Sequence, residues 1–184
     1  MRPAFLLAAV PLLIATPGAA QQSSSAISQS DKEFLEFAAQ VNQSEIQGGL
    51  AAEKKADAAA VRAFARLMVL DHMGLESQLA AIAAENGVQL PSGASEQANR
   101  EMASLQNISG SEFDTKYMED MIQGHEQVIQ KFKSEEGQTQ ARPVEALVAG
   151  ALPILQQHLA LAQAVQFGIK NQASGTVGST KKRN

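Results

Sequence analysis

The chain contains no cysteine and no tryptophan, and aromatic residues make up only 4% of its 184 positions. Without cysteine it can form no disulfide, no thiolate metal site and no lipid anchor attached through a thiol. The scarcity of aromatics, together with abundant Ala, Leu, Gln and Glu, favours packed helices over sheets. Stability must therefore come from an apolar core, and a hydrophobic content of 45% is sufficient for one domain.

Positive charge is also scarce in the body of the chain. Residues 31–169 hold all 19 acidic residues against 10 Lys and Arg, a balance of −9. This argues against nucleic-acid binding, which needs a clustered basic surface. Residues 170–184 carry four basic residues among Gly, Ser and Thr, and we expect a disordered basic tail there. Contact of this tail with an anionic envelope surface is a second interpretation.

The first 20 residues are typical of a signal peptide. Arg2 supplies a positive start, residues 5–14 form a short apolar run, and small residues precede a cleavage site near Ala20. The run is short and interrupted by Pro11, so it does not suit a membrane span. We therefore predict an exported protein, periplasmic or secreted, with no transmembrane segment in the mature chain.

Apolar periodicity predicts two helices in the first half of the mature chain. After a polar linker at residues 21–29, the first begins at Ser30, where Ser30 and Glu33 match a capping box. Asp57 is a suitable cap for the second, which continues through Glu85 and stops at Gly87. Only a residue or two separates these helices, so we expect an antiparallel hairpin.

A second pair of helices is predicted after a long connector at residues 86–110, which contains a short helix-prone piece at 96–106. The third long helix begins near Ser111, with Asp114 at cap spacing, and runs to Glu136. The fourth has Pro143 in its first turn. Four amphipathic helices over residues 30–169 predict an all-α four-helix bundle. The connector can cross this bundle or fold over one end.

Polar residues interrupt the apolar stripe of every long helix. Imidazole and carboxylate side chains on buried stripes can hold a divalent metal such as Fe, Zn, Mn or Cu. The three histidines lie one each on the second, third and fourth predicted helices, and Asp71 and Glu126 are further candidates. The predicted ligands are Glu45, Asp71, His72, His125 and His158.

The heights of these side chains limit how they can meet. At a rise of 1.5 Å per residue, they spread over roughly 11 Å along the bundle if the connector does not cross it. If the connector crosses, Glu45 and His125 lie nearly level, with the other two displaced to either side. Ligands lie within about 2.0–2.2 Å of an ion. We therefore do not expect Glu45 and all three histidines around one metal, although two or three of these four side chains can meet.

Ordinary hydrogen bonds can account for these buried polar side chains without a metal, and we favour this interpretation over a metal site. A carboxylate across the bundle can satisfy His72, and Tyr117 or a carbonyl can satisfy His125. The carbonyl that Pro153 frees can satisfy His158. Such a network specifies which helices pack together and needs no metal. On this interpretation the protein is a structural or interaction module.

Copper and enzyme chemistry receive less support. Met118 and Met121 share a stripe with His125, and thioether and imidazole ligands suit Cu(I), but methionine is also a common core filler. Asp71 and His72 are adjacent on a helix, so their side chains point about 100° apart and cannot form an acid–base pair. The sequence has no Ser-His-Asp arrangement and no phosphate-binding Gly loop. We do not predict an enzyme.

A set of short motifs from about Phe34 to Val165 resembles a bacterial exported family known as domain of unknown function 4142, grouped with ferritin-like four-helix bundles. The resemblance covers nearly all of the chain that we expect to be ordered. It implies an exported helical bundle without an assigned function. Our own expectation is a binding or stress-related envelope module that holds a divalent metal or a small ligand between its helices, with an envelope protein partner or a homo-oligomer. The motifs are Glu45 with Gly49, Ala51 and Ala52; Asp71-His72 after Phe64-Ala65; Phe113-Asp114 with Tyr117; His125-Glu126; and Leu152-Pro153 with His158-Leu159.

This sequence departs from ferritin-like proteins that bind two metal ions. Those proteins use a Glu from each of two helices and a Glu-x-x-His from each of the other two. The positions three before the histidines are Val69, Ile122 and Leu155. No Glu-x-x-His exists here, so we do not expect di-iron oxidase chemistry.

Overall fold

The computed structural model describes the backbone of residues 26–179 and the side chains of residues 26–172, so the predicted signal peptide lies outside the described residues. The described part is all-helical and contains no strand, which confirms the predicted class. Five helices form, because the helix-prone piece in the connector becomes a short helix of its own. They are α1 (Gln29–Lys55), α2 (Ala59–Asn86), α3 (Glu96–Ser104), α4 (Gly110–Glu136) and α5 (Arg142–Ser179).

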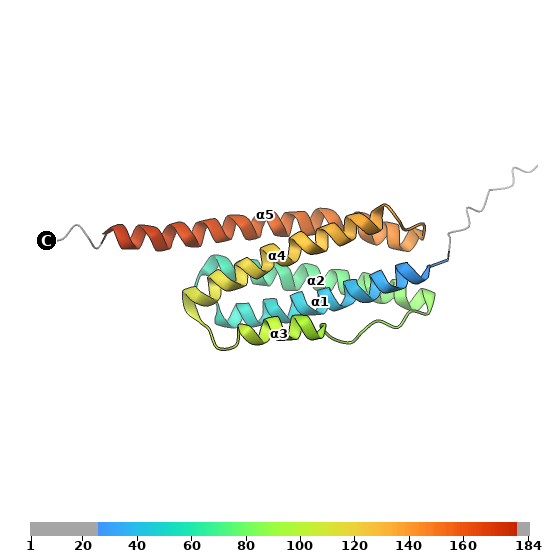
Figure 1. The fold of residues 1–184 in the computed structure, drawn as a ribbon, viewed down its shortest axis with the longest axis horizontal. Helices are drawn as coiled ribbons and strands as arrows, with labels where there is room; N and C mark the ends of the chain where they lie inside the picture. Colours follow the sequence, from blue (N-terminus) through green and yellow to red (C-terminus); the bar gives the residue numbers. More distant parts are fainter. Residues whose placement is uncertain (1–25, 180–184) are drawn as a thin grey trace, which may run out of the picture.

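The connector crosses the length of the molecule. In Figure 1 the α1–α2 turn and the α4–α5 turn lie at opposite ends, and the chain returns along α1 through α3 to begin α4. α1 packs along α2 and α4 along α5, while α2 contacts α5 and α1 contacts α4 more lightly. Neighbouring long helices are therefore antiparallel, and their inner faces meet along a shared core (Figure 1).

The start of α1 differs from the predicted one. Ser28, not Ser30, is the N-cap, and the capping box pairs Ser28 with Asp31. The Ser28 side chain accepts from the Asp31 amide at 3.1 Å, and Asp31 accepts from the Ser28 amide at 2.8 Å. The pairs Ser28–Asp31 and Ser30–Glu33 both have the Ser-x-x-acid spacing. Only Asp31 also accepts a hydrogen bond from Thr139, beside the start of α5, at 2.6 Å. A tertiary contact thus selects between two equivalent local signals.

The start of α2 also has a cap that was not predicted. Asp57 does not cap it, because Ala58 is the N-cap and makes no side-chain bond. Instead Asp114 of α4 accepts from the Asp57 and Ala58 amides at 3.0 and 2.7 Å. The carboxylate predicted to cap its own helix therefore caps a neighbouring one. The predicted stop at Gly87 is confirmed by its left-handed backbone, with φ of 64°.

Two apolar clusters fill the core, and each long helix passes from one to the other. The first apolar cluster includes Phe34, Leu75, Leu79 and Phe132, and the second includes Val61, Phe64, Met68 and Phe113. On α2, therefore, Val61, Phe64 and Met68 belong to the second cluster, and Leu75 and Leu79 belong to the first. α1, α4 and α5 make the same change between clusters. Where each helix changes cluster it carries a buried polar side chain, and together these form what we call the histidine layer. Its members are Asn42, Glu45, His72, His125 and His158.

Helix α5 is longer than predicted. It continues to Ser179, ten residues past the helical end expected at 169, because extending an existing helix adds one hydrogen bond per residue. Its segment Arg142–Gln172, with a mean hydropathy of 1.3, could cross a membrane by length and composition alone. A core helix passes the same test, and this segment carries His158 and part of the first apolar cluster.

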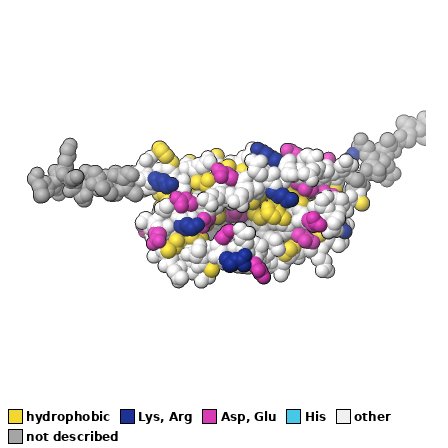
Figure 2. Space-filling model, in the orientation of Figure 1, with side chains coloured by type: hydrophobic (Ala, Val, Ile, Leu, Met, Phe, Trp, Pro, Cys, Tyr) yellow, Lys and Arg dark blue, Asp and Glu magenta, His cyan; other side chains and the backbone are white. Residues whose placement is uncertain are grey.

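The outer surface shows no segregation of charge on the face drawn in Figure 2. Acidic and basic side chains of the described residues are interspersed over it, and no histidine is visible there. The burial of the histidines explains the latter, since each is at most 2% exposed. The chemistry of the imidazoles is therefore internal to the fold.

A candidate metal centre

Three helices bring one imidazole each to the same point of the core. His72 comes from α2, His125 from α4 and His158 from α5, and the ring centroids are 5.5–6.3 Å apart. One ring nitrogen from each histidine lies within 4.8 Å of the other two. The three histidines therefore meet, as the height argument allowed for two or three ligands.

Each imidazole is held by one hydrogen bond on one of its two nitrogens. His72 Nδ1 pairs with Asn42 Oδ1 on α1 at 2.8 Å, and His125 Nδ1 pairs with the carbonyl of Met121 at 2.8 Å. His158 Nε2 pairs with a carboxylate oxygen of Asp71 at 2.9 Å. A side-chain amide oxygen, a backbone carbonyl and a carboxylate thus orient the three rings.

These partners determine which nitrogen carries the proton. An amide oxygen, a carbonyl oxygen and a carboxylate can only accept, so the bonded nitrogen of each neutral ring must donate. The other nitrogen of each ring then carries a lone pair. In the described residues these nitrogens, His72 Nε2, His125 Nε2 and His158 Nδ1, are buried and have no hydrogen-bond partner. Three buried acceptors without a hydrogen-bond partner are an unusual and costly arrangement.

Burial lowers the pKa of two of the three imidazoles, His72 and His158. Desolvation, with a contribution from the neighbouring histidines, lowers the pKa of His72 to about 3. Burial also lowers the pKa of His158, although its bond to Asp71 opposes that shift. Both rings are therefore neutral near pH 7, the state in which imidazole coordinates a metal.

Glu45 lies near His125, and Tyr117 lies near Glu45. Burial raises the pKa of the Glu45 carboxyl, and the nearby His125 offsets part of that rise. Burial and the neighbouring Glu45 raise the pKa of the Tyr117 hydroxyl. Glu45 Oε2 and the Tyr117 hydroxyl both lack a hydrogen-bond partner among the described residues. The histidine layer therefore has an unsatisfied carboxyl in addition to its three unpaired nitrogens, and an unsatisfied hydroxyl lies near that carboxyl.

The predicted site residues occupy different places around this point. The three histidines converge, whereas Glu45 is buried beside His125 but is not part of the close group of ligand atoms. Asp71 is partly exposed and orients His158 from outside. Glu126 is exposed. Of the two methionines considered for copper, Met118 is buried in the second apolar cluster and Met121 packs against that cluster.

The hydrogen-bond partners expected for the histidines are partly wrong. His72 pairs with an amide instead of a carboxylate, and His158 pairs with Asp71 instead of the carbonyl freed by Pro153. The carbonyl expected for His125 is confirmed and belongs to Met121. Sequence reasoning missed Asn42, although it lies four residues after Ala38 and three before Glu45 on the same stripe.

One family model matches most of the chain. The family model covers residues 16–165, which include every member of the histidine layer. No curated protein and no solved structure matches the chain significantly. The chain belongs to the family described as domain of unknown function DUF4142.

Proposed function

We propose that this protein is an exported, ferritin-like four-helix bundle that binds one transition-metal cation between its helices. His72 Nε2, His125 Nε2 and His158 Nδ1 are the ligands. The observation that carries the proposal is the convergence of three buried rings, each with one nitrogen held by an acceptor and the other without a hydrogen-bond partner among the described residues. Metal-binding histidines are oriented in this way in proteins.

The donor set favours a particular class of cation. Three neutral imidazoles suit Zn²⁺ and Cu²⁺, whereas Mg²⁺ and Ca²⁺ prefer oxygen ligands. Two nitrogens bound to one tetrahedral zinc lie about 3.4 Å apart. In this structure one nitrogen from each histidine lies within 4.8 Å of the other two, so we expect metal binding to draw the three rings slightly together. Three protein ligands leave one coordination position open.

Zinc-dependent melting of a tag-free protein tests this proposal. A polyhistidine tag must be avoided because it would bind zinc itself. Without a tag, all three histidines of the chain lie in the proposed site. Zinc at one hundred times its Kd stabilises a one-site protein by about 2.7 kcal/mol, which raises the Tm by roughly 5–10 °C. We expect this shift in the wild type, one zinc per chain by elemental analysis, and no shift in His125→Ala. Magnesium serves as the control cation.

A structural module without metal is the second candidate, because the same hydrogen bonds link helices. Asn42 with His72 joins α1 to α2, and Asp71 with His158 joins α2 to α5. Such bonds specify helix pairing whether or not a metal binds. If the wild type melts identically with and without zinc or copper and holds neither metal, this second function replaces the first.

A further inference from the structure

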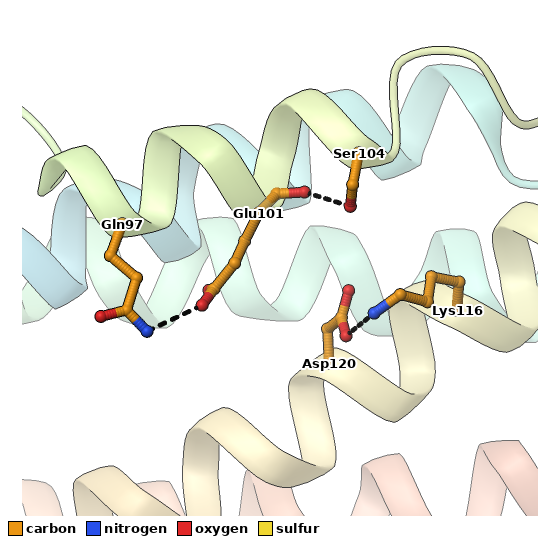
Figure 3. Close-up of polar contacts among 5 residues, drawn as sticks. All are labelled: Gln97, Glu101, Ser104, Lys116 and Asp120. Atoms are coloured by element: carbon orange, nitrogen blue, oxygen red, sulfur yellow. Dashed lines mark hydrogen bonds and ion pairs between the residues drawn. The ribbon is translucent and has the colours of Figure 1, made fainter.

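A cleft opens between α1, α3 and α4 on the side where α1 and α4 contact each other lightly. Its volume is about 340 Å³. Gln97 and Glu101 of α3 line one wall and are bonded to each other at 3.0 Å, along their own helix. Figure 3 shows that the contacts drawn for α3 and α4 likewise remain within each helix. The drawn polar contacts therefore do not tie the two walls together.

Glu45 lines this cleft and also adjoins the histidines. Its side chain lines the cleft and is near enough to His125 to interact with it electrostatically. Glu45 is 7% exposed, and its Oε2 is buried without a partner. A carboxylate in this position can accept a cation from the solvent side and is next to the histidines on the other side. We call this space the Glu45 cleft.

A glycine keeps the floor of the Glu45 cleft open. Gly124 of α4 precedes His125 and lines the cleft, and a Cβ built on it would lie 3.9 Å from Glu45 Oε1. A single methyl therefore fits in ordinary contact, whereas a larger side chain would fill the space beside the carboxylate. Only a side chain larger than that of alanine would therefore close the opening beside Glu45.

We propose that the Glu45 cleft is the route by which a transition-metal cation enters the histidine layer, with Glu45 as the carboxylate that first receives it. The cation exchanges water for the carboxylate and then for the three imidazoles. This inference rests on the proposed metal-binding function. It assigns Glu45 an entry role, in agreement with its position outside the close group of ligand atoms.

The other cavities of the described residues suit entry less well. A space of about 20 Å³ touches His72 but lies among apolar side chains of the first cluster and holds about one water at most. A pocket of about 160 Å³ between α1 and α2 reaches Asn42, whose Oδ1 is already bonded to His72. It presents no carboxylate to the histidines. The cavity beside the α5 residues Val165 to Gln172 does not reach the layer.

The rate of zinc exchange tests this inference. Uptake by metal-free, tag-free protein and release to a chromogenic chelator are measured by stopped flow. We expect Gly124→Leu to slow uptake and release equally, by about tenfold, which corresponds to roughly 1.4 kcal/mol added to the barrier. The zinc affinity should stay near the wild-type value. Gly150→Leu is the matched control, because Gly150 is exposed on α5 and a Cβ built on it would meet nothing within 4 Å apart from its own stretch of helix. This variant should exchange zinc at the wild-type rate.

Further variants keep the test valid if Gly124→Leu does not fold. Ala98→Trp fills the cleft from α3, where Ala98 is only partly buried, and should also slow exchange. Glu45→Gln should slow uptake while leaving one zinc per chain at saturation. Exchange at the wild-type rate in all folded variants overturns the entry route. Absence of zinc from the wild type overturns the proposed function instead, so the two failures can be told apart.

Discussion

Two polar clusters of the described residues differ in how completely their hydrogen bonds are made. One is the histidine layer. The other, which we call the Asp31 cluster, lies where the start of α1 meets the α4–α5 turn and consists of the buried Asp31, Glu135 and Thr139 together with the exposed Ser28. In the Asp31 cluster, Ser28 and Thr139 donate to the two Asp31 oxygens at 2.6 Å each. Thr139 Oγ1 in turn accepts from the Ala141 amide at 3.2 Å.

The histidine layer and its neighbour Tyr117 leave six buried polar atoms without a partner, and no atom of the Asp31 cluster is among them. Buried polar groups in folded proteins are nearly always paired, so a concentration of unpaired ones needs an explanation. The hydrogen bonds of the Asp31 cluster have a structural role, because they hold the start of α1 against the α4–α5 turn. No such role explains the unpaired histidine nitrogens, and a bound cation would pair with them, although not with the Asn42 Nδ2 donor. On the proposed function, the contrast separates a structural network from a functional one.

Acid is expected to weaken the metal-free fold in two stages, one for each cluster. His72 has its ordinary pKa of 6.5 in the unfolded chain and about 3 in the fold, so its contribution is complete above pH 6.5 and declines as the pH falls towards 3. The loss from His72 reaches about 3 kcal/mol between pH 6.5 and 4. Glu45 opposes it, because a raised pKa stabilises the fold more at low pH. Denaturant titrations of metal-free protein measure the sum.

The Asp31 stage begins at lower pH. Burial would raise the pKa of Asp31, but the bonds from Ser28 and Thr139 hold it below 3.8. Its stabilisation is therefore present above pH 3.8 and is lost only as the pH falls through the lowered value. Asp31→Asn should keep the decline between pH 6.5 and 4, while His72→Gln should reduce it. A decline in that upper range that is unaffected by His72→Gln would contradict the assignment.

Asp31→Ala should reduce the free energy of unfolding by about 2 kcal/mol, because it removes a cap and leaves Thr139 without its acceptor. Glu33→Ala is the matched control, because Glu33 lies two residues after Asp31, is exposed, and is the capping-box residue that the sequence predicted. Its change should stay within roughly 0.5 kcal/mol. Zinc binding should be unaffected in both variants. Equal losses in the two would mean that the Ser30 register caps the helix after all.

Asn42→Ala should weaken zinc binding by about 10–100-fold, the usual effect of removing a group that orients a ligand. Asn42 holds Nδ1 of His72 and so directs Nε2 towards the other rings. Gln43→Ala is the control, because the neighbouring amide bonds Glu76 across the α1–α2 hairpin. Competition with a chelator of known affinity measures both. An unchanged affinity in Asn42→Ala would show that ring orientation does not depend on this bond.

The same contrast explains what could be predicted from the sequence. The helices and the burial of three histidines follow from apolar spacing, which acts along one helix at a time. Caps and ring partners depend on contacts between helices. Ser28 and Ser30 offer equivalent caps until Thr139 selects one, and Asp114 serves a helix other than its own. The Asp71–His158 pair needs the register of α2 against α5, which no local pattern encodes.

Glu45→Met should stabilise the metal-free protein, in contrast to any truncation of Asp31. Replacing a buried carboxyl that lacks a partner by an apolar side chain of similar length removes a desolvation cost, and we expect a gain of about 1 kcal/mol in unfolding free energy. The same variant should take up zinc more slowly. Denaturation and stopped-flow exchange on one preparation measure both effects. A loss of stability would instead show that Glu45 stabilises the fold, as Asp31 does. The unpaired carboxyl would then not be a cost in stability that is retained for function.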